Sequence, residues 1–137
     1  MKRFTLAILR GMLVLIITRV ITQYIFEDIL RHPAYSLGTV FVKDCLSIAA
    51  GALVAGYSNR ERGWLVGLLL ACFLCVGLVV LWTYLSEFPL THVLYGILRH
   101  PTTLLQFPVF LALGTLVGMG GSMLRNRIGR PQPQPLP

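Results

Sequence analysis

The sequence predicts an all-α integral membrane protein in which four transmembrane helices form two tandem helical-hairpin repeats, with short helices at the outer interface. Composition is the first indication, because 55% of the 137 residues are hydrophobic and only 12% are charged. The spacing of charges is the second, since residues 63–86 and 101–124 contain no Asp, Glu, Lys or Arg. Each stretch exceeds the roughly 20 apolar residues that cross a bilayer as a helix. The third is a pattern that occurs twice along the chain.

Two further stretches complete the four predicted spans, although each carries charged residues. The first contains Arg10 and Arg19, and the second contains Lys43 and Asp44 near its start. We predict a first hairpin at 1–63 with spans 4–26 and 37–57, a second hairpin at 64–130 with spans 64–86 and 102–124, and a disordered Pro/Gln tail at 131–137.

The repeated pattern begins with the residue types Ile-Leu-Arg-His-Pro, which occur at residues 29–33 and again at residues 97–101. Arg and His favour the negative end of a helix dipole and Pro stops a helix, so we expect the pattern to mark a helix end twice. Before the second copy, apolar side chains follow the spacing of an amphipathic helix. We therefore predict a short helix in the outer membrane interface ahead of each copy.

The basic residues predict the orientation of the chain. The net charge is +7, and these residues gather at the ends of the predicted spans instead of forming a soluble basic face. This distribution argues against a nucleic-acid partner. By the positive-inside rule both termini lie in the cytoplasm, and we expect a protein of the bacterial cytoplasmic (inner) membrane. The predicted inner side carries Lys2, Arg3, Arg60, Arg62, Arg125, Arg127 and Arg130, and the outer side carries Arg31 and Arg99.

Arg19 is the most costly residue of the first span, because a charge at that depth costs at least about 2.5 kcal/mol and needs a partner inside the bundle. Asp44 lies at a similar depth in the second span. We predict an Arg19–Asp44 ion pair, with Lys43 directed outward to the headgroups. Such a pair either fixes the packing of two helices or forms the polar centre of a path for a solute or proton. The polar stripe beside it consists of Gln23, Thr18 and Thr22.

Small residues recur at every fourth position on one face of the second span and again on the fourth span. Small side chains let membrane helices approach closely. We expect these helix-packing faces to bring the second and fourth spans together within the chain, and the alternative is a seam between two copies in a homodimer. The faces consist of Ser47, Gly51 and Ala55 and, at the corresponding positions of the second repeat, Gly114, Gly118 and Ser122, which include a GxxxG motif.

Histidine and acidic side chains near the predicted outer surface raise the hypothesis of a pH-sensitive or metal-binding site there. The set lacks any recognised ligand spacing, and capping of interfacial helices explains it more simply. We therefore predict no metal and no cofactor. The residues concerned are His32, His100, His92, Asp28 and Glu87.

Cys72 and Cys75 form a Cys-x-x-Cys pair in the third span, which is a motif of thiol oxidoreductases. Both lie deep in hydrocarbon, where burial removes the thiolate that performs disulfide exchange. The third cysteine, Cys45, lies in the second span, and no cysteine pair stands in an outer loop. We expect all three to act as small apolar fillers.

No stretch offers a nucleophile beside a base, a phosphate-binding loop or a nucleotide fingerprint, so we do not expect an enzyme. The first hypothesis is an accessory subunit that acts by helix packing, with the lipid bilayer and either a membrane-protein partner or a second copy as its contacts. The alternative is a small dimeric transporter or channel with a polar centre at Arg19, Gln23 and Asp44. A thiol oxidoreductase that uses Cys72 and Cys75 is the remote alternative. The second repeat has Leu111 or Ala112 where Asp44 would fall, which favours the first hypothesis.

Overall fold

The computed structural model of the chain describes residues 2–26, 37–59, 61–86, 89–99 and 101–128. Within these ranges the chain is helical and contains no strand. Four of the described helices are long and apolar enough to cross a membrane, which confirms the all-helical class and the number of predicted spans. The helices are α1 (Lys2–Tyr24), α2 (Leu37–Ser58), α3 (Gly63–Ser86), α4 (Leu90–Arg99) and α5 (Pro101–Ile128).

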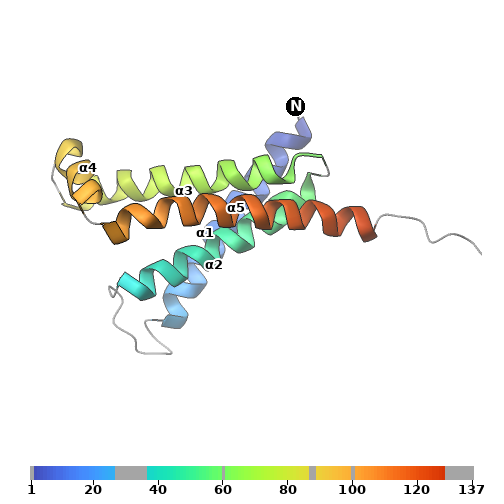
Figure 1. Cartoon of the computed structure of the whole chain (residues 1–137). Helices are drawn as coiled ribbons and strands as arrows, with labels where there is room; N and C mark the ends of the chain where they lie inside the picture. The colour runs from blue at the N-terminus through green and yellow to red at the C-terminus, as the bar shows by residue number, and fades with distance from the viewer. Residues whose placement is uncertain (1, 27–36, 60, 87–88, 100, 129–137) are drawn as a thin grey trace, which may run out of the picture.

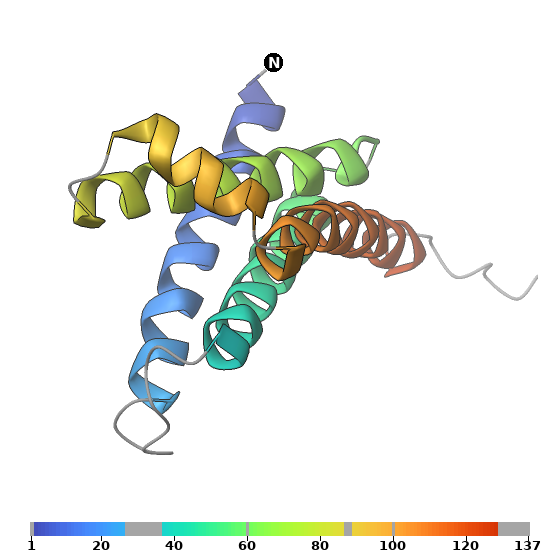
Figure 2. The same cartoon turned by 60° about the vertical axis from the view of Figure 1, so that its left-hand side comes forward.

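The long helices form two antiparallel hairpins, α1–α2 and α3–α5, that cross each other at an angle (Figures 1 and 2). The central element is α2, which packs against α1, α5 and α3, whereas α1 and α3 touch over a small area. The start of α1, the turn between α2 and α3 and the end of α5 lie at one end of the molecule, and α4 lies at the other (Figure 1). All basic residues of the predicted inner side that the structure describes are therefore at a common end.

The α1–α2 hairpin is held by a close approach of two glycines. A Cβ built on Gly51 would lie 2.8 Å from the carbonyl oxygen of Gly11 and 2.9 Å from Cβ of Leu15. In the reverse direction, a Cβ built on Gly11 would lie 2.7 Å from Cβ of Ala55. Real side chains do not reach such distances, so only glycine at positions 11 and 51 lets these two backbones touch.

The α3–α5 hairpin is built in the same way. A Cβ built on Gly114 would lie 2.6 Å from the carbonyl oxygen of Gly67 and 2.9 Å from Cβ of Ala71. A Cβ on Gly118 would collide with the carbonyl oxygen of Gly63. Each hairpin therefore closes where glycines of one helix meet glycines of the other.

The helices α2 and α5 pack against each other as predicted, but only part of each small-residue face lies at that contact. Gly51 and Ala55 of α2 face α1, whereas Gly114 of α5 faces α3. The helices α2 and α5 do contact each other, but they use Gly56, whose added Cβ would collide with Gly118, and Gly121, whose added Cβ would collide with the backbone of α2. The prediction that the second and fourth spans meet within the chain is confirmed. Gly51, Ala55 and Gly114 nevertheless pack inside their own hairpins, because a stripe of small residues allows close packing without specifying which helix supplies the neighbour.

Two clusters of buried side chains join the hairpins. One links α1, α2 and α3 through Ala7, Ala55, Val66 and Leu70. The other links α2, α3 and α5 through Ile48, Ala71, Cys75 and Phe110. Beside the second cluster the rings of Phe41 and Phe110 stack with centroids 5.5 Å apart. These contacts fix the crossing of the two hairpins around α2.

The connection from α3 to α5 contains α4, which has one buried residue, Val93, and packs against both of its neighbours in sequence. The helix ends at Arg99 and α5 begins at Pro101, a position where the missing N–H of proline leaves no helical bond unmade. Pro108 lies inside α5, where its missing N–H removes one backbone hydrogen bond of the helix.

Candidate functional site: a polar centre between α1 and α2

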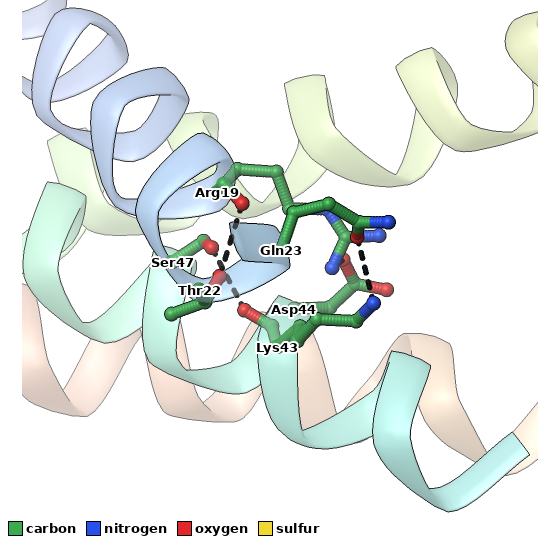
Figure 3. Close-up of polar contacts among 6 residues, drawn as sticks. All are labelled: Arg19, Thr22, Gln23, Lys43, Asp44 and Ser47. Carbon is green, nitrogen blue, oxygen red and sulfur yellow. Dashed lines mark hydrogen bonds and ion pairs between the residues drawn. The ribbon is translucent and has the colours of Figure 1, made fainter. Parts of the chain in front are cut away.

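Arg19 and Asp44 form the centre of the candidate site. The Nη1 atom of Arg19 on α1 lies 2.7 Å from Oδ1 of Asp44 on α2 (Figure 3). Neither atom has a hydrogen-bond partner, so the two groups lie close together without the alignment of a hydrogen bond. Attraction between opposite charges therefore holds the pair, and the burial of the Asp44 side chain strengthens it.

Lys43 completes the site in a way that the sequence did not predict. Its side chain is only 1% exposed, and Nζ donates a 2.7 Å hydrogen bond to Oε1 of Gln23 on α1 (Figure 3). The prediction that Lys43 extends outward to the headgroups was wrong. A buried ammonium is stable only with acceptors, and the amide of Gln23, within one turn of Arg19, supplies one.

The hydroxyl groups near the charges are satisfied within their own helices. Thr22 Oγ1 donates to the carbonyl oxygen of Arg19 at 3.1 Å, and Ser47 Oγ donates to that of Lys43 at 2.7 Å (Figure 3). Thr18 is half-buried on the same helix as Thr22. Thr22 and Ser47 thus add polar side chains whose hydroxyl groups are hydrogen-bonded.

The two members of the ion pair differ in exposure. The side chain of Asp44 is 3% exposed, whereas that of Arg19 is 29% exposed. Arg19 and Lys43 carry two positive charges and Asp44 one negative charge, so the centre has a net charge of one positive unit. The site is therefore a charged group inside a predicted span, open on its arginine side.

The second hairpin does not contribute to this centre. Leu111, which the predicted repeat aligns with Asp44, packs against the apolar cluster that contains Ile48 and Phe110. Two cavities formed by described residues lie elsewhere: one at the end where α1 begins, and a small apolar one between α1 and α3 lined by residues such as Leu15 and Phe73. Neither is lined by Arg19, Gln23 or Asp44.

Of the residues in the predicted outer site, the structure describes His92 alone. His92 is exposed on α4, and its backbone N–H donates to the carbonyl oxygen of Pro89 at 2.9 Å. The other candidates, Asp28, His32, Glu87 and His100, lie outside the described residues. Among the residues that the structure describes, no group of His, Cys, Asp and Glu could hold a metal ion.

The three cysteines are free thiols. Cys75 is buried in the cluster with Ile48 and Phe110, while Cys72 and Cys45 are half-buried. Cys75 thus packs as an apolar side chain in the core of the crossing, as expected of a small apolar filler.

Arg125 makes a contact that sequence reasoning missed. From the last turn of α5, its Nη1 donates to the carbonyl oxygens of Tyr57 and Ser58 at 2.9 and 2.8 Å, and its guanidinium lies 5.8 Å from the centre of the Tyr57 ring. These carbonyls end α2 and have no partner within that helix. Arg125 therefore fastens the second hairpin to the first at this end of the molecule.

Comparison with protein-family models, with curated proteins and with solved structures gives no match to this chain.

Proposed function

We propose that this protein is a small, non-enzymatic subunit of the membrane that binds a membrane-protein partner by helix packing. The observation that carries the proposal is the exposure of Arg19, which stays 29% exposed beside an almost fully buried Asp44. A charge within the bilayer costs at least about 2.5 kcal/mol unless it is covered by protein. A partner helix lying over α1 at this depth would cover the guanidinium and remove that cost.

The charge of the polar centre supports the same conclusion. Its net positive unit, from Arg19, Lys43 and Asp44, would be balanced by one Asp or Glu on the partner. Opposite charges across an interface align two proteins and exclude wrong partners. The partner that fits is therefore a transmembrane helix with a carboxylate at the depth of Arg19.

The surface of α1 suits such a partner. Around Arg19 it exposes Ile16, Ile17 and Val20, which are 55%, 48% and 64% exposed. Large aliphatic side chains around a single charge would pack against a neighbouring helix while the charge sets its register.

The setting that we propose is the bacterial cytoplasmic membrane, with both termini in the cytoplasm. Support comes from the basic residues at the end where α1 begins and α5 ends. We further propose that the hairpins are tandem repeats, because each closes on a glycine-to-glycine approach, and that α4 lies in the outer interface, because it is short and amphipathic.

The second candidate is a dimeric transporter. It is favoured by the connection of four polar side chains across α1 and α2, with Arg19 bound to Asp44 and Lys43 to Gln23. Two copies that face each other through α1 would place two such centres around a shared path. The spans of the second hairpin, 64–86 and 102–124, contain no charged residue, which argues against a path inside one chain.

A photo-crosslinking amino acid at Val20 tests the proposal, because this exposed position follows Arg19 directly. Leu116 on α5, which has the same 64% exposure, is the matched control. We expect crosslinking in intact cells to give one adduct from position 20 that contains a different protein, and none from position 116. An adduct of two copies of this chain would favour the transporter, and lipid adducts alone at both positions would contradict both candidates.

A further inference from the structure

A basic cavity lies at the end of the molecule where α1 begins, apart from the polar centre. Its volume is about 960 Å³, and it is bounded by the first turns of α1, the turn between α2 and α3, and the last turns of α5. Figures 1 and 2 show that these three segments gather at this end without α1 and α5 running alongside each other. The cavity occupies the space between them.

The lining is strongly positive. It includes Arg3 and Arg10 from α1, Arg62 from the α2–α3 turn and Arg125 from α5, against Glu61 as the acidic side chain among its described residues. Arginines from three separate segments therefore converge on one cavity, although they are far apart in sequence. Such convergence of like charges is unfavourable unless an anion lies among them.

Most of the guanidinium groups have donors to spare. Within the described part of the chain, the guanidinium groups of Arg3, Arg10 and Arg62 make no hydrogen bond or ion pair, while Arg125 uses Nη1 for the end of α2. Each guanidinium carries five N–H donors in a planar fork that matches a phosphate group. The donor set around the cavity is thus suited to a phosphate oxyanion.

The depth of the cavity indicates a lipid in particular. Arg10 lies two turns further along α1 than Arg3, or about 10 Å at 1.5 Å per residue. The headgroup layer on each side of a bilayer is roughly 5 to 8 Å thick. A cavity that follows α1 from Arg3 to Arg10 therefore crosses this layer, and its wall also contains Phe4 and Leu6, which suit the glycerol and upper acyl chains.

We propose that this cavity binds an anionic phospholipid, with its phosphate held among Arg3, Arg10 and Arg62 and its upper acyl chains against Phe4 and Leu6. Basic pockets between transmembrane helices on the cytoplasmic side are known to take such headgroups. The inference does not depend on the role of the polar centre.

The test uses the purified full-length protein after delipidation in detergent, with binding measured by native mass spectrometry. The probes are short-chain phosphatidylglycerol, short-chain phosphatidylcholine of the same chain length, and inorganic phosphate. Each charge near the membrane surface contributes about fivefold in affinity, so Arg3→Gln with Arg62→Gln should weaken phosphatidylglycerol binding about thirtyfold. If this pair fails to fold, Arg3→Gln alone should weaken it about fivefold.

Arg127→Gln is the matched control, because Arg127 is exposed near the end of α5 but does not line the cavity. It should leave the affinity unchanged, and phosphatidylcholine should bind at least tenfold more weakly than phosphatidylglycerol. The proposal is overturned if Arg127→Gln weakens binding as much as the cavity variants, or if the two lipids bind equally. Inorganic phosphate that binds as tightly as phosphatidylglycerol would assign the cavity to a soluble anion and overturn the lipid assignment.

Discussion

The carbonyl oxygen of Gly11 lies so close to Gly51 that a Cβ added at residue 51 would be 2.8 Å from it. This contact brings α1 and α2 together about two turns from the polar centre. The same contact explains why Arg19 and Asp44, two isolated charges in different helices, reach each other at 2.7 Å.

The replacement Gly51→Val should therefore force the two helices apart. We expect it to destabilise the protein by about 1–3 kcal/mol, which is typical of overpacking a close contact. Gly77→Val is the control, since nothing lies within 4 Å of a Cβ at that position. Unfolding in detergent measures both, and equal stability of the two variants would contradict the role of Gly51.

The Arg19–Asp44 pair should respond differently to single and double replacement. Asp44→Asn leaves the guanidinium and the Lys43 ammonium without their carboxylate, at an expected cost of about 3–5 kcal/mol. Replacing both partners, with Arg19→Met and Asp44→Leu, should recover part of that loss because the costly charge is removed as well. Unfolding in detergent of the unmodified protein, Asp44→Asn and the double variant tests this. A double variant that is less stable than Asp44→Asn would show that the pair is more than a charge contact.

The hydrogen bond between Lys43 and Gln23 should also stabilise the packing of α2 against α1. Gln23→Leu removes one hydrogen-bond acceptor of a nearly inaccessible ammonium, and we expect a loss of about 1–3 kcal/mol in the free energy of unfolding. With Lys43→Met as the background, the same Gln23→Leu change should have little effect. Similar losses in both backgrounds would mean that the Lys43–Gln23 hydrogen bond does not contribute.

Arg125 should contribute less to the free energy of unfolding than the buried groups do, because its contacts are near the surface. Arg125→Gln removes the donor to the carbonyl oxygens of Tyr57 and Ser58, and we expect a loss of about 1 kcal/mol. Arg127→Gln, a charge change of the same size in the same helix, should have a negligible effect. A hydrogen-exchange measurement on Arg125→Gln should show faster exchange confined to the end of α2. Unchanged exchange there would contradict a stabilising role of the hydrogen bonds from Arg125.

The sequence was enough to predict the helices, because charge-free stretches and the length of a bilayer crossing are local properties. It was also enough to predict that Arg19 and Asp44 meet, since their depths could be counted from the ends of their spans. The neighbours of Gly51 could not be predicted, because a small residue permits a close approach without choosing the partner helix. Lys43 has a long stem that could point either way, and only the position of Gln23 across the interface determines its direction.

The contact of Arg125 shows the same limitation. A basic residue in the last turn of a helix is explained by the helix dipole alone, so its sequence context gives no reason to look for a second helix end. The contact exists because the crossing of the hairpins brings the end of α5 against the end of α2.

The central claim is that the polar centre binds a different membrane protein, and the mass of the particle purified in mild detergent tests it most directly. A complex with a partner has a mass that is not a whole multiple of the mass of this chain, and we expect Arg19→Gln to release the partner while Arg99→Gln retains it. A particle of one chain, or of whole multiples of this chain only, would contradict the claim.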